Sequence, residues 1–390
     1  MRDTELRATM PLGIVQASLT FAESHRRDSR ARFQVTIWGL VLMIVAAVGA
    51  CPAEPLESQK EMPPRFTSPK STEAAGGINY NYTATFTAPT GPSASVVYLA
   101  YPSWLKVEDG SVKGTPPDGA TDTSIAVVVS DGLLAETTRV AIKITPNIVV
   151  YGDTRTGSVV HRQITALIVR TQPTVVFHTG DLVSTGSLPD DWAKFNSIAA
   201  PLRAIAEFYP ALGNHEGQSA LFFNNFKLPN NEQWYSVERN RICFVVLNSS
   251  AATDVNSPQY HWLDSTLAAA ATDSIEFKVA IIHDPPFSSG AHPEDEKGLR
   301  LTLVPLFERY KVAVVFSGHD HDYERSYCGG IYYIVTGGGG APLYNRARNL
   351  PCSQEFAKKY HFCRLARVGD RMIITVVGLD SQEIDKFEVH

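Results

Sequence analysis

Short apolar runs that end in a glycine and a polar cluster recur along the second half of the chain. This pattern constrains the fold more than any other feature. Ile148 to Tyr151 is followed by Gly-Asp-Thr-Arg, and Val175 to Phe177 is followed by His-Thr-Gly-Asp. Between the two runs, apolar residues recur at the spacing of one helix face. Strand-length runs that alternate with helical patterns predict a layered α/β domain over residues 147–390.

Three further apolar runs end in polar residues. Phe208 to Leu212 precedes Gly-Asn-His-Glu, Val279 to Ile282 precedes His283, and Val312 to Phe316 precedes Ser-Gly-His-Asp-His. Ligand sites in open α/β sheets form at the carboxyl ends of the strands, so clusters at five strand ends can converge on one site. The glycines allow the tight turns that such convergence requires.

The side chains expected to converge are carboxylates, one amide oxygen and imidazoles, without sulfur. Oxygen and nitrogen donors of this kind suit Mn, Fe or Zn better than they suit a thiolate centre. A carboxylate can also bridge two cations about 3.5–4 Å apart and clamp the attacking and leaving oxygens of a phosphoryl displacement. The residues expected at this site are Asp153, Asp181, Asn214, His215, His283, His319 and His321.

Other polar residues are expected to have structural roles. His178 lies within an apolar run, and His161 and His261 lie on predicted helices, so these three histidines are interpreted as core or surface residues. The acidic run Glu294-Asp295-Glu296 is expected to be solvated surface.

The blocks GDTR, GD, GNHE, the histidine that ends VAIIH, and GHDHDYER occur in this order over about residues 147–390. They resemble the blocks of the calcineurin-like metallophosphoesterases, and within them the purple acid phosphatase-like branch. The resemblance implies a layered α/β/β/α domain that hydrolyses phosphate esters with two divalent or mixed-valence metal ions (Fe, Mn or Zn).

The resemblance also implies a role for each residue. Asp153, Asp181 and His321 would hold the first ion. Asp181 would bridge to a second ion, whose other ligands would be Asn214, His283 and His319. His215 would bind no metal; it would contact the phosphate and protonate the leaving oxygen.

Two positions depart from the resembled pattern. Purple acid phosphatases carry a tyrosine ligand three residues after the second aspartate, where this chain has Ser184. Other members carry a histidine two residues after the first aspartate, where this chain has Arg155. A guanidinium stays protonated and cannot replace that ligand, but its fork of donors suits phosphate oxygens. Arg155 is therefore expected to contact substrate, the alternative being a pair with a carboxylate such as Asp153 or Glu216.

Hydrolysis of small phosphomonoesters is the favoured function. The alternatives are a phosphodiesterase or nucleotidase at the same site, or a non-catalytic surface-binding protein with a degraded site. The formal net charge of −5 provides no overall basic surface, so no nucleic-acid partner is expected. The sequence makes no prediction of the oligomeric state.

The N-terminal segment, residues 1–51, has the order of an export signal. A basic stretch from His25 to Arg32 precedes an uncharged apolar run from Phe33 to Ala50. Small residues before Cys51 resemble the lipobox of bacterial lipoproteins, so we expect an exported, membrane-tethered protein of the cell envelope. An uncleaved transmembrane anchor and a soluble secreted protein are the alternatives.

Two segments separate this signal from the α/β domain. Residues 52–76 are rich in Pro, Glu, Lys and Ser and are interpreted as a flexible tether. Residues 77–146 combine short alternating runs with frequent turn signals, which favours a small all-β sandwich. Phrases such as Pro102-Ser103-Trp104-Leu105 resemble immunoglobulin-like surface modules.

The cysteines after Cys51 yield two expectations. Cys243 lies in an apolar run and is expected to be a buried thiol. Cys328, Cys352 and Cys363 lie close together in the sequence, so an exported protein could form a disulfide among them.

Overall fold

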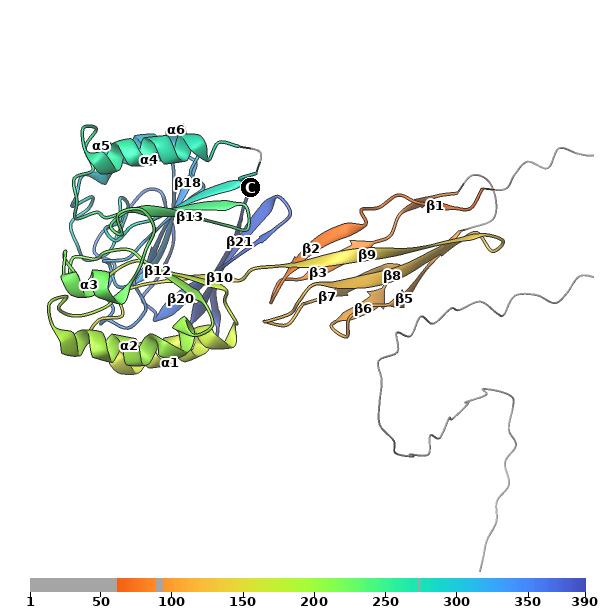
Figure 1. Ribbon diagram of the computed structural model, residues 1–390, viewed down its shortest axis with the longest axis horizontal. Helices are drawn as coiled ribbons and strands as arrows, with labels where there is room; N and C mark the ends of the chain where they lie inside the picture. Colours follow the sequence, from red (N-terminus) through yellow and green to blue (C-terminus); the bar gives the residue numbers. More distant parts are fainter. Residues whose placement is uncertain (1–61, 89–93, 273) are drawn as a thin grey trace, which may run out of the picture. The chain divides into compact units, whose positions relative to one another are not determined.

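The computed structural model describes residues 62–88, 94–272 and 274–390 (Figure 1). The predicted signal segment, Cys51 and the beginning of the predicted tether lie outside the described residues. Within the described part of the chain, no helix has the length and apolar character needed to cross a membrane.

The N-terminal part of the described chain is all β. One sheet has the order β2-β9-β8-β5 and another the order β3-β7-β6, and β1 pairs with β4. In β8, residues at every second position are fully buried, which is the period of a strand with one face in a core. The strands are β1 (Arg65–Phe66), β2 (Ser71–Ala75), β3 (Tyr80–Thr83), β4 (Phe86–Thr87), β5 (Ser95–Ala100), β6 (Leu105–Glu108), β7 (Ser111–Gly114), β8 (Thr123–Ser130) and β9 (Ala135–Thr145).

The sheet begins earlier than residue 77, where the tether was expected to end. Strand β2 pairs in parallel with β9, and Ala74 and Ala75 are buried. The polar composition of this segment suggested a tether because only alternate residues of an edge strand need to be apolar.

The C-terminal domain contains two mixed sheets. The first has the order β12-β11-β10-β20-β21-β22, and the second has the order β13-β14-β15-β16-β18-β17-β19. The strands are β10 (Ile148–Tyr151), β11 (Val175–His178), β12 (Glu207–Pro210), β13 (Tyr235–Arg239), β14 (Ile242–Val246), β15 (Phe277–Ile281), β16 (Val314–Ser317), β17 (Tyr323–Cys328), β18 (Ile331–Thr336), β19 (Ser353–Ala357), β20 (His361–Val368), β21 (Arg371–Gly378) and β22 (Glu383–Val389).

Helices cover the outer face of each sheet of this domain (Figure 1). Helices α1 and α2 pack on the first sheet, and α4, α5 and α6 pack on the second. Apolar residues of both sheets, including Phe177 and Phe244, form a shared core between them. The helices are α1 (Ser158–Arg170), α2 (Pro189–Arg203), α3 (Ala220–Asn225), α4 (Pro258–Ala269), α5 (Leu299–Thr302) and α6 (Val304–Arg309). The α/β layering predicted for this domain is confirmed.

The direction of the strands determines where the polar loops meet. Strands β10, β11 and β12 run parallel to one another, and so do β14, β15 and β16. The loops that follow β10, β11, β12, β15 and β16 therefore leave the two sheets at carboxyl ends. These loops carry all the residues predicted for the site.

The cysteine expectations are confirmed for the described residues. Cys328, at the end of β17, forms a disulfide with Cys352, just before β19. Cys243 and Cys363 are buried free thiols.

Candidate metal centre

Three predicted ligands lie in a backbone conformation that L-residues rarely adopt. The φ angles of Asp153, Asp181 and His319 are 58°, 58° and 68°. Each follows a glycine at a strand end, and the backbone N–H of His319 donates to both carboxylate oxygens of Asp153 at 3.1 Å. Residues outside the common φ and ψ regions cost about 1–3 kcal/mol each and concentrate at functional sites. Strained turns at three strand ends thus carry three of the predicted ligands.

The first group of ligands is Asp153, Asp181 and His321. All three are buried, and their ligand atoms lie within 4.8 Å of one another. The Nε2 atom of His321 lies 3.5 Å from Oδ1 of Asp153. Hydrogen bonds from nitrogen to oxygen measure about 2.7–3.2 Å. Two ligands of one tetrahedral cation, each about 2.0–2.2 Å from it, lie about 3.3–3.6 Å apart. The observed spacing is that of atoms sharing a cation.

The second group surrounds His283. Its Nε2 atom lies 2.9 Å from Oδ1 of Asn214 and 3.4 Å from Oδ1 of Asp181. Burial opposes the charge on His283, but the carboxylates of Asp181, Asp153 and Asp284 outweigh it and raise its pKa to about 9. Even without a metal, the surrounding groups therefore favour positive charge at this position.

Ionisation of both central carboxylates, Asp153 and Asp181, is unfavourable without nearby positive charge. Burial raises the pKa of Asp153 well above its usual range, with the charge of Asp181 adding to the effect. Burial acts in the same direction on Asp181, but His283 and His215 outweigh it, so the pKa of Asp181 is lowered. Adjacent buried carboxylates need nearby cations to be ionised together. These residues therefore fit the metal ions that the sequence implies.

Three imidazoles of the site are oriented in the same way. Each has its Nδ1 atom within hydrogen-bond distance of a backbone carbonyl. Because a carbonyl only accepts, Nδ1 carries the proton and Nε2 faces the site, as in metal-ligating histidines. The pairs are His283 with Thr179 at 2.9 Å, His321 with Pro342 at 2.8 Å, and His215 with Ser184 at 2.7 Å.

His319, expected as a ligand of the second ion, lies with a different set of side chains. Among the described residues it groups with Asp284 and Glu296, and its ring centroid lies 5.1 Å from that of His283. Glu296 is exposed, as expected, and its carboxylate also lies 3.5 Å from Nε2 of His319. Sequence spacing did not reveal this, because the loop after β15 folds back over the site.

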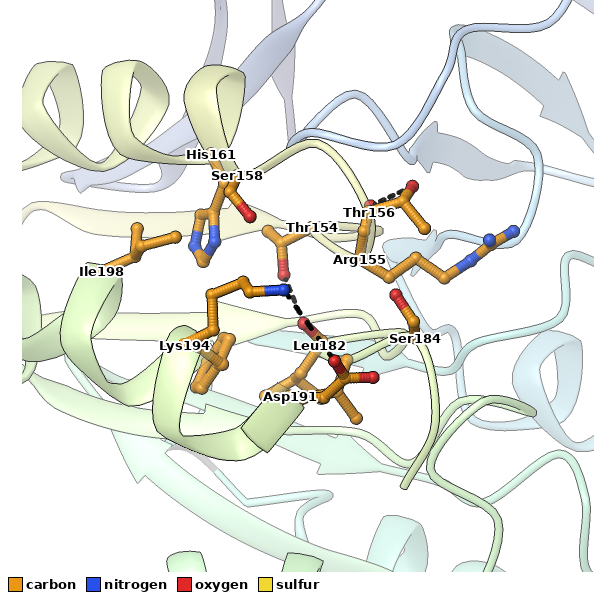
Figure 2. Close-up of a pocket in the computed structure, with 12 residues that line it drawn as sticks. Thr154, Arg155, Thr156, Ser158, His161, Leu182, Ser184, Asp191, Lys194 and Ile198 are labelled. Carbon is orange, nitrogen blue, oxygen red and sulfur yellow. Dashed lines mark hydrogen bonds and ion pairs between the residues drawn. The ribbon is translucent and has the colours of Figure 1, made fainter. Parts of the chain in front are cut away.

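Arg155 lies against the first group. Its Nε atom donates to Oδ2 of Asp181 at 3.0 Å, and its Nη2 atom lies 3.3 Å from Nε2 of His321. The pair with a carboxylate that was the alternative expectation is thus present, although with Asp181. Figure 2 shows that Arg155 and Ser184, the two departures from the resembled pattern, line one pocket.

Glu216 is a structural residue of the site whose role the sequence reasoning missed. Its buried carboxylate accepts hydrogen bonds from the backbone N–H groups of Asp181 at 2.8 Å, Val183 at 3.1 Å and Gly213 at 2.9 Å. It therefore braces the loop after β11 against the loop after β12. Its place in the GNHE block was the available signal.

The histidines expected outside the site have the predicted roles. His178 and His161 are buried, and His261 is exposed on α4. The backbone N–H of Gly180 lies 3.2 Å from Nδ1 of His178, and Thr154 Oγ1 lies 3.2 Å from its Nε2. His178 thus links the loop after β10 to the loop after β11 through these two contacts.

Comparisons with known proteins find similar phosphoesterases. Residues 146–323 match the family model described as calcineurin-like phosphoesterase. A phosphoenolpyruvate phosphatase of Allium cepa is 26% identical over 42% of this chain and 37% of its own length. Purple acid phosphatase 1 of Ipomoea batatas is 29% identical over 39% of this chain and 36% of its own length. The chain thus spans little more than a third of these relatives.

A solved structure has a similar fold. The purple acid phosphatase PPD1 from yellow lupin, Lupinus luteus, superimposes with a TM-score of 0.55. The match covers 83% of this chain and 73% of that chain, at 17% sequence identity. The C-terminal domain is thus similar to calcineurin-like phosphoesterases over residues 146–323, and its fold resembles that of a purple acid phosphatase.

The brace formed by Glu216 leads to a prediction. In Glu216→Ala, three buried N–H groups lose their acceptor, and each unpaired donor costs about 1–3 kcal/mol. We expect the free energy of unfolding in urea to fall by about 3 kcal/mol or more. Glu238→Ala, at an exposed position of β13, is the control and should change stability by less than about 0.5 kcal/mol. Equal stability of the two variants would contradict the bracing role.

Proposed function

We propose that this chain hydrolyses phosphate esters at a two-metal site in its C-terminal domain. The observation that carries the proposal is the buried group of Asp153, Asp181 and His321, whose spacing and charge suit a cation. Asp181 would also contribute to a second ion, with Asn214, His283 and His319. When bound, such ions polarise a phosphoryl oxygen and lower the pKa of a water molecule.

His215 would supply the proton for the leaving oxygen. Its Nδ1–H is held by the carbonyl of Ser184, so the proton that it can transfer is on Nε2. That atom lies 3.8 Å from Oδ2 of Asp181, which places it at the edge of the first group of ligands. The side chain is 29% exposed, so it can reach a bound substrate.

Arg155 would contact the phosphate of the substrate. Its guanidinium carries five N–H donors, and the contacts with Asp181 and His321 occupy only some of them. The contacts with Asp181 and His321 place the guanidinium beside the first group of ligands. A planar fork in this position can bind two phosphate oxygens.

Phosphomonoesters are the proposed substrate class. A proton donor such as His215 matters most when the leaving group is a poor one, as in alkyl monoesters. The names of the two sequence relatives, a phosphoenolpyruvate phosphatase and a purple acid phosphatase, support the same class. Activity on 4-nitrophenyl phosphate above that on its bis ester would support this choice, and the reverse would favour a phosphodiesterase.

We expect Asp181→Asn to abolish hydrolysis of 4-nitrophenyl phosphate. The neutral amide removes the charge shared by both groups of ligands, although its shape is nearly the same. Metal content, measured after equilibration with Mn²⁺ or Zn²⁺, should fall in parallel. The matched control is Asp370→Asn at an exposed turn, which should keep both properties. Full activity of Asp181→Asn would refute the two-metal mechanism.

For His215→Ala, kcat should fall by about 10²–10⁴-fold, the usual contribution of general acid catalysis. Bound metal should stay unchanged, because His215 is not a proposed ligand. The loss should shrink for aryl phosphates whose leaving groups need no proton. His261→Ala on the surface of α4 is the control. A large loss of metal from His215→Ala would show that this residue is a ligand instead.

We further propose that the chain is an exported lipoprotein in which an immunoglobulin-like sandwich separates the membrane from the phosphoesterase domain. The support is the basic stretch, the apolar run and the small residues before Cys51. The alternation of the strands from β2 to β9 supports the sandwich.

Expression in a bacterial host should yield a mature chain that begins at a diacylated Cys51, detectable by mass spectrometry of the N-terminal peptide. Cys51→Ala should leave the apolar run uncleaved or cleaved elsewhere, without lipid. A parent chain that still carries residues 33–50 would favour the transmembrane anchor.

A further inference from the structure

A second candidate group of metal ligands lies beside the proposed pair. It consists of Asp284 and Glu296, on the loop after β15, and His319, on the loop after β16. Their ligand atoms lie within 4.8 Å of one another. Asp284 and Glu296 have no counterpart in the ligand set that the sequence resemblance implies.

The spacing within this group is that of metal ligands. Nε2 of His319 lies 3.7 Å from Oδ1 of Asp284 and 3.5 Å from Oε2 of Glu296. Both separations exceed the hydrogen-bond range of about 2.7–3.2 Å. They approach the separation of about 3.3–3.6 Å between two ligands of one tetrahedral cation.

Two of the three ligand atoms have no other partner. Oδ1 of Asp284 and Nε2 of His319 are buried and form no hydrogen bond, although their side chains are only 3% and 11% exposed. A buried polar atom without a partner costs about 1–3 kcal/mol. A cation between these two atoms would satisfy both at once.

Neighbouring groups hold the two side chains in place. The hydroxyl of Ser249 donates to Oδ2 of Asp284, which leaves Oδ1 facing His319. The imidazole of His292 stacks on that of His319 at a centroid distance of 3.7 Å. His292 is itself fixed, since its backbone N–H donates to Oδ1 of Asp320 at 3.0 Å and its Nδ1 lies 2.9 Å from the same oxygen. Such outer contacts orient ligands and tune metal affinity.

We propose that Asp284, Glu296 and His319 form a third divalent-cation site beside the proposed pair. Two carboxylates and an imidazole, without sulfur, suit Zn²⁺ or Mn²⁺. Glu296 is 41% exposed, so the site can exchange its cation with solvent. A cation there would fasten the loop after β15 to the end of β16.

His319 links this site to the proposed catalytic pair. A neutral imidazole has a single nitrogen lone pair, so His319 ligates one cation at a time. Occupation of the third site therefore removes a ligand from the second ion of the pair. This consequence rests on the proposed function: excess Zn²⁺ or Mn²⁺ should inhibit hydrolysis by the full-length chain.

The test is equilibrium dialysis of the metal-stripped, full-length chain against Zn²⁺ and Mn²⁺. The parent should bind one cation whose dissociation constant rises by at least about tenfold in Glu296→Gln, because a ligand is lost. Glu294→Gln, on the same loop but paired with Arg300, is the charge-matched control and should bind like the parent. Because Glu296 is exposed, the variant should fold, which circular dichroism can verify. Identical binding by Glu296→Gln and the parent would overturn the third site.

The background of Asp181→Asn separates this proposal from the proposed function. Asp181→Asn should no longer bind the two cations of the proposed catalytic pair, but it should still bind one cation. Adding Glu296→Gln to this variant should abolish binding of that remaining cation. If the parent binds this cation but hydrolyses no phosphoester, the proposed function is refuted and the third site is retained. Excess-cation inhibition that is equally strong in the parent and Glu296→Gln would refute the competition for His319.

Discussion

The buried pair of carboxylates, Asp153 and Asp181, is the constraint on which the rest of the site depends. Removal of two adjacent negative charges from water is costly unless positive charge lies beside them. The surroundings supply it in several forms. Arg155 donates to Asp181, and His283 is held with a pKa raised to about 9 by the same carboxylates despite its burial. Backbone N–H groups add further donors, as at His319 and His215. A site built in this way is ready for cations.

Much of this organisation could be predicted from the sequence, because strand ends have a strong local signature. The runs before Gly152, Gly180, Gly213 and Gly318 became strands that deliver their polar residues to one side of the sheets. The features that escaped prediction depend on long-range geometry. The brace of Glu216 exists only where two loops meet, and the approach of Glu296 to His319 depends on the path of a long loop. The early start of the sheet at β2 was hidden because an edge strand tolerates polar residues.

The two departures from the resembled pattern can be understood together. Ser184 removes an anionic ligand that a phenolate would have supplied, and Arg155 adds a permanent positive charge at the same group of carboxylates. Both changes make the net charge around the first group of ligands less negative. A first cation would therefore have less negative charge to offset. The first group therefore has less need of a trivalent ion, and a divalent ion with a guanidinium beside it can balance Asp153 and Asp181.

The loop after β15 carries residues of both proposed cation sites. It carries His283, a proposed ligand of the catalytic pair, and continues through Asp284, His292 and Glu296, all of which approach His319. The same contacts with Asp284, His292 and Glu296 therefore fix both the path of this loop and the orientation of the His319 imidazole. A change that moves the loop must also move the imidazole, because the stack with His292 and the carboxylate of Asp284 both act on it. A cation at the proposed third site would therefore fix the loop and the imidazole together.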